Sequence, residues 1–395
     1  MSSPALNAAT AIIALADRAN SADVLLRRTL SGDWTPPDRR WIARAVFSFF
    51  RWRGWLEPDC LARESPASAD PSEVQITPRQ LEDKVCEAIS LQDQFNLNPR
   101  RYPSSELARR CLPGWLSRFL SPPEEWLRVL QSEPTLWIRA KRGAAEELAF
   151  KLGSCRPAGT DLWSHSLAYQ GTEDLYCSPA FHAGEFEIQD IASQMVSLLV
   201  SPQPGEKWWD VCAGEGGKTL HLADLMQNRG LIIATDRAEW RLRKLKRRAA
   251  RARMFNYRAK LWDGAEKLPT RITFDGVLLD APCSGIGTWQ RNPHARWTTF
   301  PQDIEELRRK QLALLIHASA AVKSGGKLAY AVCTLTGPET SDIRNSFDER
   351  PSGFIPLSLD LPHGGFPSQG AEHLWWPQQT GGNGMYVALW KRNQG

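Results

Sequence analysis

Short apolar runs and amphipathic segments alternate along the C-terminal half of the chain. Five mainly apolar runs of four to six residues have the pattern of strands buried on both faces. Segments with apolar residues at every third or fourth position lie between them and predict helices. Strands that alternate with helices predict a mostly parallel sheet with both faces covered. The predicted strands are 207–211, 231–235, 276–279, 327–332 and 385–390, and the predicted helices are 219–226, 237–253 and 302–322.

The first part of the chain has helical periodicity and no convincing alternating strand. Trp41, Ala45, Phe49 and Trp52 recur at helical spacing, with arginines around this stripe. The pattern then becomes mixed, with a strand-like run at 135–139, and a break rich in Pro and Gly at 201–205 precedes the alternating region. We predict an all-helical domain at 1–130, a small α/β linking domain at 131–200 and the α/β domain at 201–395.

Length and composition are those of a globular protein of two or three domains. The 395 residues are 42% hydrophobic and 24% charged, and no apolar run approaches the roughly 18 residues of a membrane span. The eight cysteines include no CxxC pair and no zinc-finger spacing. We therefore expect a cytoplasmic protein with reduced thiols, no metal and no membrane association.

The positive charge is concentrated in one predicted helix. The chain has a formal net charge of +5, and residues 237–253 hold nine basic residues and one acid, or +8. The rest of the chain is therefore net negative. A solvated helix face explains this pattern, and so does a surface that binds the phosphates of a nucleic acid.

A glycine-rich turn and an acid follow the first two predicted strands of the α/β domain. The turn at 210–219 lacks the glycine spacing of a phosphate-binding P-loop and of the dinucleotide fingerprint. Its small residues would let a ligand approach backbone N–H groups at a helix N-terminus, and Asp236 is placed to bind ribose hydroxyls. A tight turn with a helix cap is the alternative. The candidate ligand-binding residues of the turn are Cys212, Ala213, Gly214, Gly216, Gly217 and Lys218.

Two cysteines follow predicted strands of the same sheet. Cys283 comes after the strand at 276–279, and Cys333 ends the strand at 327–332. A cysteine at a strand end is usually a small buried residue. A thiol has an ordinary pKa of about 8.5, so a reactive one needs a polar or basic environment, for which Lys218 and Arg291 are candidates.

These motifs resemble the Nop/Sun family of RNA 5-methylcytosine methyltransferases, and within it the RsmB-like branch that modifies ribosomal RNA. The most specific match is the run Asp280-Ala281-Pro282-Cys283-Ser284-Gly285, followed by Arg291-Asn292-Pro293 and Trp297. The helical front end, particularly 38–55, weakly resembles the NusB-like RNA-binding domain of that branch. The similar segments are 181–194, 210–219, 236–242, 280–285, 330–334, 376–377 and 384–389.

The resemblance implies a Rossmann-like class I methyltransferase domain that uses S-adenosylmethionine to methylate carbon 5 of a cytidine in RNA, with ribosomal RNA as the expected substrate. By family position, Cys333 adds to carbon 6 of the base and Cys283 assists release of the product. Asp280, with Lys218 nearby, would bind the base edge. Asp236 would hold the cofactor ribose, Asp263 would lie by the adenine and Arg241 would flank the cofactor site. We expect a monomer.

Several departures from the family pattern leave other functions open. Glu215 follows Gly214 where members of the family usually have Ala-Pro, and the run 337–341 keeps one acid but no Asn. One alternative is therefore a degenerate methyltransferase fold that binds RNA without catalysis. Another keeps the cofactor but makes Cys283 the nucleophile. A nicotinamide-dependent oxidoreductase is disfavoured by Thr219 and by the thiols. His294 and Gln290 also depart from the common pattern.

Overall fold

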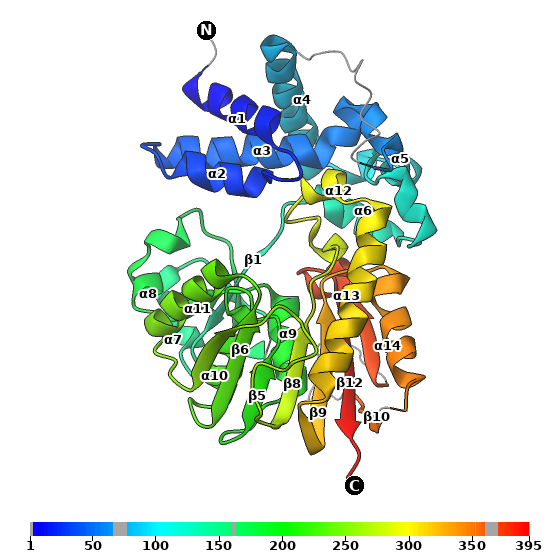
Figure 1. Ribbon diagram of the computed structural model, residues 1–395. Coiled ribbons are helices and arrows are strands. Elements are labelled where there is room, and N and C mark those ends of the chain that lie inside the picture. The colour runs from blue at the N-terminus through cyan, green and yellow to red at the C-terminus, as the bar shows by residue number, and fades with distance from the viewer. Residues whose placement is uncertain (1–2, 66–76, 160–162, 352, 360–369, 395) are drawn as a thin grey trace. The chain divides into compact units, whose positions relative to one another are not determined.

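The chain divides into two compact units, each built from two segments. A computed structural model describes residues 3–65, 77–159, 163–351, 353–359 and 370–394. The helical unit comprises Met1–Pro134 and Ser284–Glu305, and the α/β unit comprises Thr135–Cys283 and Glu306–Gly395. Figure 1 shows both units and labels most of their helices.

The described residues of the helical unit contain helices and no strand. Thr35 caps α3 through its hydroxyl, and Pro36 occupies the first turn, where a missing N–H costs nothing. The stripe predicted from sequence lies on α3, with Ala45, Phe49 and Trp52 buried. The helices are α1 (Pro4–Leu15), α2 (Ala22–Leu30), α3 (Pro36–Leu56), α4 (Pro78–Leu97), α5 (Ser104–Arg110), α6 (Glu124–Gln131) and α12 (Ala295–Thr298).

The segment 284–305 belongs to the helical unit, although the sequence analysis placed it within the domain at 201–395. Trp297 is buried in the same apolar cluster as Phe49 and Phe50. Its indole Nε1 donates a hydrogen bond to the Phe50 carbonyl at 2.6 Å. Sequence spacing alone gives no sign of these contacts, because their partners lie more than 240 positions earlier in the chain.

A fully buried guanidinium fixes this segment. Arg296 donates to the carbonyl oxygens of Cys111 at 3.0 Å and Leu130 at 3.2 Å, and to the side-chain oxygen of Gln131 at 3.2 Å. Burial lowers the pKa of Arg296 to about 10. These acceptors are neutral, so the buried charge is stabilised by hydrogen bonds to them.

We predict that Arg296→Ala destabilises the helical unit by about 3 kcal/mol, because it leaves several buried acceptors unsatisfied. Thermal unfolding followed by circular dichroism measures this loss as a lower melting temperature. Arg28→Ala, at an exposed position on α2, is the control and should change stability by less than about 0.5 kcal/mol. Equal melting temperatures for the two variants would contradict the structural role of Arg296.

A small antiparallel sheet precedes the large sheet within the α/β unit. Its order is β2-β3-β1-β4. Trp137 on β1 packs into the core of the large sheet and donates to the Gly381 carbonyl at 2.8 Å. The segment predicted as a linking domain at 131–200 is therefore packed on the larger sheet. Its elements are β1 (Leu136–Ala140), α7 (Ala145–Leu152), β2 (Cys155–Pro157), β3 (Ser166–Tyr169), α8 (Pro179–His182), β4 (Phe186–Ile188) and α9 (Ile191–Val200).

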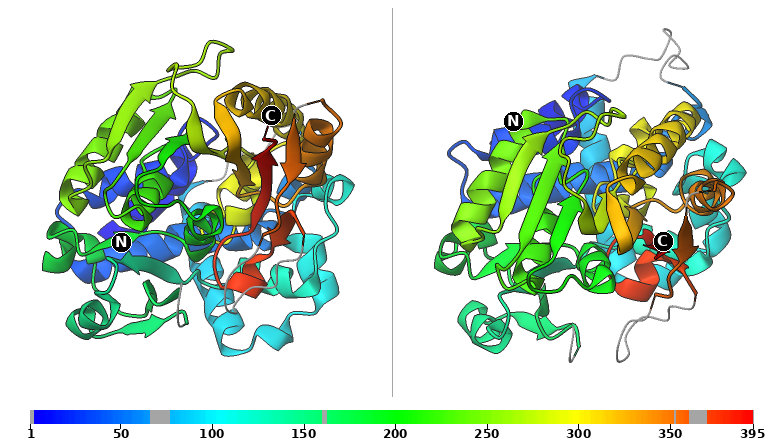
Figure 2. Two further views of the ribbon diagram at one scale, coloured as in Figure 1. Left: turned by 90° about the horizontal axis from the view of Figure 1, so that it is seen from below. Right: turned by 60° about the horizontal axis from the view of Figure 1, so that its bottom comes forward.

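The large sheet is mostly parallel, as the sequence predicted. Its order is β10-β12-β9-β8-β5-β6-β7, with β11 also paired to β12. The strands from β5 to β9 run parallel, whereas β12 runs antiparallel beside β9, as Figures 1 and 2 show. The strands are β5 (Lys207–Asp210), β6 (Leu231–Asp236), β7 (Tyr257–Leu261), β8 (Phe274–Asp280), β9 (Val322–Val332), β10 (Phe354–Pro356), β11 (Glu372–Trp375) and β12 (Met385–Arg392).

Helices cover both faces of this sheet. Successive residues of a strand point to opposite faces, so Trp208 joins one core cluster and Trp209 joins the other. One cluster includes side chains of α9, α10 (Gly217–Leu225) and α11 (Glu239–Ala252). The other includes side chains of α13 (Pro301–Ser319) and α14 (Ser341–Asp348). No helix among the described residues is long and apolar enough to cross a membrane.

Candidate functional site

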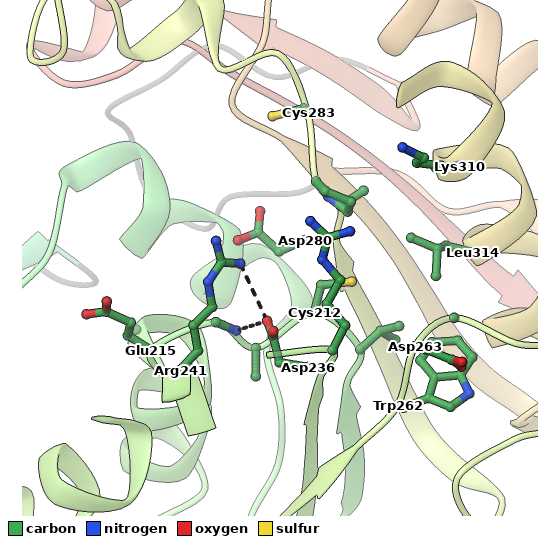
Figure 3. Close-up of a pocket in the computed structure, with 18 of the residues that line it drawn as sticks. Cys212, Glu215, Asp236, Arg241, Trp262, Asp263, Asp280, Cys283, Lys310 and Leu314 are labelled. Atoms are coloured by element: carbon green, nitrogen blue, oxygen red, sulfur yellow. Dashed lines mark hydrogen bonds and ion pairs between the residues drawn. The ribbon is translucent and has the colours of Figure 1, made fainter. Parts of the chain in front are cut away.

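A cleft of about 550 Å³ lies at the carboxyl edge of the parallel strands. This is the edge at which ligands bind in open α/β sheets. Figure 3 shows side chains from several strand ends and from α13 around it. Most of the residues predicted from sequence line the cleft: Cys212, Ala213, Gly214, Gly217, Asp236, Arg241, Asp263, Asp280, Cys283 and Cys333.

The other two predicted residues, Gly216 and Lys218, support the cleft without lining it. Gly216 is the N-cap of α10, with a φ of +89°. A Cβ atom there would lie 2.6 Å from Cγ of Leu245, so only glycine fits this turn against α11. Lys218 is buried behind the cleft wall and reaches Asp280.

Asp236 ends β6 and closes the glycine turn. Its Oδ2 accepts a hydrogen bond from the Gly214 N–H at 3.0 Å, and its Oδ1 accepts from the Ala238 N–H at 2.8 Å. Arg241 Nη1 lies 3.8 Å from Oδ2, a contact that Figure 3 draws as a dashed line. These contacts fix the carboxylate at the cleft with oxygen lone pairs still available for two hydroxyl donors.

Asp280 and Lys218 form an ion pair at the end of β8. Lys218 Nζ lies 2.6 Å from Asp280 Oδ2. Burial is the largest influence on the pKa of Lys218 and lowers it, but the charge and hydrogen bond of Asp280, with Cys333 and Asp210, raise the pKa overall. Lys218 therefore stays protonated and holds a positive charge beside the thiols.

The two thiols lie together. The Sγ atoms of Cys283 and Cys333 are 3.4 Å apart. The hydrogen bond to Cys333 and then burial raise the pKa of Cys283 well above the ordinary thiol value. Arg291, the other candidate for the thiol environment, belongs to the helical unit. The pair can thus combine a nucleophile with a protonated thiol at one point of the cleft.

The cleft also contains residues that sequence reasoning missed. Trp262 and Leu314 form an apolar wall beside Asp263, as Figure 3 shows, and Lys310 lies one turn before Leu314 on α13. Asp263 Oδ1 accepts from the Ala265 N–H at 3.0 Å. The spacing of Lys310 and Leu314 places both on one face of the helix. Because this face mixes polar and apolar residues, the sequence pattern did not indicate that it lines a ligand site.

Comparison with known sequences identifies the α/β unit. The family described as 16S rRNA methyltransferase RsmB/F matches residues 197–391, which include the strands and loops that form the cleft. Residues 197–391 belong to the RsmB/F methyltransferase family. This confirms the family resemblance found in the sequence motifs.

Two curated relatives and one solved structure extend this result. The probable ribosomal RNA small subunit methyltransferase B of Synechocystis is 43% identical over 166 residues, covering 41% of this chain and 36% of the relative. The protein of the same description from Bacillus subtilis is 32% identical over 244 residues, covering 61% and 53%. This chain therefore spans about one third to one half of these relatives. The crystal structure of PH0851 matches with a TM-score of 0.78 at 24% identity, covering 99% of this chain and 100% of that one, and supports the fold.

The main departure from the RsmB/F pattern is compensated locally. Glu215 Oε1 accepts from Lys244 Nζ of α11 at 2.6 Å, and Arg248 Nη1 donates to the Glu215 carbonyl at 3.0 Å. The additional carboxylate of the turn is therefore paired with a cation of the adjacent helix. This pairing reduces its repulsion toward any anionic group in the cleft.

Some basic side chains of α11 pair with acids of the same unit, and others are exposed to solvent. Arg248 and Arg251 both pair with Glu187 of the small sheet, and Lys244 pairs with Glu215. The exposed basic side chains on this helix and its C-cap include Arg243, Lys246, Arg247 and Arg253. The +8 charge of the segment thus overstates the charge available to a partner.

Asp210 is a buried acid behind the glycine turn of this RsmB/F domain. Its Oδ2 accepts from the Thr219 hydroxyl at 2.6 Å, while its Oδ1 is buried and has no hydrogen-bond partner among the described residues. Burial above all, with the carboxylates of Asp280 and Asp236, raises the pKa of Asp210 to about 7. Between pH 4 and 7 the folded state therefore holds a proton that the unfolded chain has released.

We predict that Asp210→Asn becomes more stable relative to the wild-type protein as pH rises from 4 to 8. Because the pKa is raised, ionisation of Asp210 lowers the free energy of unfolding of the wild-type protein by up to roughly 4 kcal/mol above pH 7. Asn cannot ionise, so the variant does not lose this stability. Urea unfolding at several pH values measures the difference. Asp342→Asn, at an exposed position in the first turn of α14, is the control. A difference between Asp210→Asn and wild type that is constant across pH would show that Asp210 does not titrate in this range.

Proposed function

We propose that this protein transfers a methyl group from S-adenosylmethionine to carbon 5 of a cytidine in RNA, with ribosomal RNA as the substrate class. The observation that carries the proposal is the 3.4 Å separation of the Cys283 and Cys333 Sγ atoms in the cleft that contains Asp236. A thiol pair beside a ribose-binding carboxylate suits covalent catalysis on a pyrimidine with a nucleoside cofactor. Membership of residues 197–391 in the RsmB/F family supports this assignment.

One half of the cleft fits the cofactor. Asp236 would bind the ribose hydroxyls, with Arg241 beside it. Asp263 would lie at the adenine edge, between the wall of Trp262 and Leu314. Apart from Glu215, the turn from Cys212 to Gly217 consists of small residues, which leave room for the amino-acid chain of the cofactor. When bound, S-adenosylmethionine supplies an electrophilic methyl group.

The other half of the cleft fits the base. The Cys333 thiolate would add to carbon 6 of cytosine, and this addition makes carbon 5 nucleophilic. Asp280, held by Lys218, would accept a hydrogen bond from the amino edge of the base, and the Lys218 cation would offset the negative charge that develops on the N3 side. After carbon 5 has gained the methyl group, Cys283 would assist removal of its proton. The electrons of that C–H bond then form the carbon 5–carbon 6 double bond as the Cys333 thiolate leaves.

The substrate base must leave any stack to reach these thiols, so an unpaired target is expected. We propose that the helical unit contributes to RNA binding, as a NusB-like domain would. The eight cysteines are all free, which suits work in the reducing cytoplasm, and we propose that the chain acts there as a monomer without a metal.

Covalent trapping separates the proposed roles of the two thiols. We predict that Cys283→Ala accumulates an RNA–protein adduct stable on denaturing gels, because elimination is blocked after Cys333 has added. Cys333→Ala should form no adduct and transfer less than about 1% of the tritium that wild type transfers from labelled S-adenosylmethionine to RNA.

The converse result, an adduct with Cys333→Ala only, would assign the nucleophile to Cys283. Wild-type protein that binds RNA but transfers no tritium would instead support the noncatalytic RNA-binding alternative. Cys86→Ala, at an exposed thiol of the helical unit, is the matched control and should behave as wild type.

The exposed face of α11 gives a separate test of RNA binding. Lys246→Glu with Arg247→Glu should weaken RNA binding and reduce the slope of log affinity against log salt by roughly one to two, because each contacted phosphate releases a counterion. Arg248 is left intact because it pairs with Glu187. Filter binding at several salt concentrations measures the slope.

The control makes the same change of charge at the amino edge of the parallel strands, which is the edge opposite the cleft. Arg271 precedes β8 and Lys391 lies near the end of the antiparallel β12, and both are exposed. Arg271→Glu with Lys391→Glu should leave the salt slope close to the wild-type value. Equal salt slopes for the two double variants would show that the exposed face of α11 is an ordinary solvated surface that does not contact RNA phosphates.

A further inference from the structure

One buried amide joins the two loops that carry the thiols. Gln311 on α13 is fully buried. Its Nε2 donates to the Pro282 carbonyl at 2.9 Å and to Glu339 Oε1 at 3.0 Å. Pro282 directly precedes Cys283, so a single side-chain nitrogen holds the first thiol loop and the side chain of Glu339 together.

Glu339 in turn organises the loop after Cys333. Its carboxylate has no exposure to solvent. The Oε2 atom accepts from the hydroxyls of Thr334 at 3.1 Å and Thr336 at 3.0 Å. The Tyr330 hydroxyl on β9 donates to the Glu339 carbonyl at 2.7 Å. The chain on both sides of Cys333 is therefore tied to one residue.

We propose that Gln311 and Glu339 are positioning residues that hold Cys283 and Cys333 in contact. The importance of this pair for catalysis rests on the proposed function, whereas its effect on the distance between the thiols does not. Buried polar groups of this kind pre-organise a reactive pair, because their geometry is fixed before the substrate binds. Neither residue touches the cofactor half of the cleft, since neither lines it.

The charge of Glu339 adds a second effect on the same pair. Cys283 already has a raised pKa from its hydrogen bond to Cys333 and from burial, and the nearby Glu339 carboxylate raises it further. A negative charge at this position therefore favours the protonated form of Cys283. This is the form from which Cys283 can donate its hydrogen bond to Cys333.

Thiol cross-linking tests the positioning effect without any need for activity. Diamide oxidises two adjacent thiols to a disulfide by taking one hydrogen from each, and mass spectrometry of the peptides measures the rate for Cys283 with Cys333. Gln311→Ala and Glu339→Ala should each slow this rate by about tenfold or more. Glu339→Gln keeps an acceptor for Gln311 and should restore most of the rate. Glu306→Ala, at an exposed position on the same helix, is the control.

Methyl transfer then tests the consequence for catalysis. Gln311→Ala should lower kcat by about 10- to 100-fold and leave the Kd for S-adenosylmethionine within about threefold of wild type, because misplacement of one reactive group slows the reaction without removing cofactor contacts. It should also accumulate some RNA adduct, since a displaced Cys283 assists elimination less well.

The possible results separate the two proposals. An unchanged rate of cross-linking in Gln311→Ala would overturn the positioning role. The role would also be overturned if Gln311→Ala and Glu339→Gln both lost cross-linking, cofactor binding and folding together. Slower cross-linking in a protein whose wild type transfers no methyl group would keep the positioning role and reject the proposed function.

Discussion

The parallel register of four strands is the constraint on which the candidate site depends. Asp210 pairs with Ala234 of β6 and with Leu278 of β8, and Asp280 of β8 pairs with Ala331 of β9. Each strand therefore ends at nearly the same level of the sheet. Cys283 and Cys333 follow their strands by three and one residues, and they meet although 50 positions separate them in the chain. A shift of one residue in any of these pairings would turn a site residue into the core.

The arrangement of polar groups behind the cleft follows from this convergence. Strand ends that meet at one edge bring Asp210, Asp236 and Asp280 close together, with Lys218 as the counter-charge. Burial, together with the neighbouring carboxylates, raises the pKa of Asp210 to about 7. The backbone N–H of Gly214 donates a hydrogen bond to Asp236 and so stabilises the charge of that carboxylate. The cleft thus combines a fixed anion for hydroxyl groups, a fixed ion pair and two thiols.

The sequence predicted the large sheet and the ligand edge because buried strands and glycine turns leave local patterns. Strand β7 escaped prediction, since it is an edge strand that lacks the apolar run of a buried strand. Its Arg258, Lys260 and Leu261 are exposed, and its other two residues are half-buried. The membership of 284–305 in the helical unit depends on Trp297 and Arg296, whose partners are distant in sequence. Gln311 gave no signal because a single polar residue in a helix is recognisable as buried only when its acceptors are known. Charge counting likewise could not show that Glu187 and Glu215 pair with much of the basic helix.

The most direct measurement of the central claim is a peptide map of the protein after reaction with S-adenosylmethionine and an RNA that contains 5-fluorocytidine. Fluorine replaces the hydrogen that must leave carbon 5, so the attacking sulfur remains bonded to the base. We expect the modified nucleotide on the peptide that contains Cys333, with the transferred methyl group included in its mass. Attachment to Cys283, or complete absence of attachment in protein that binds both ligands, would contradict this account.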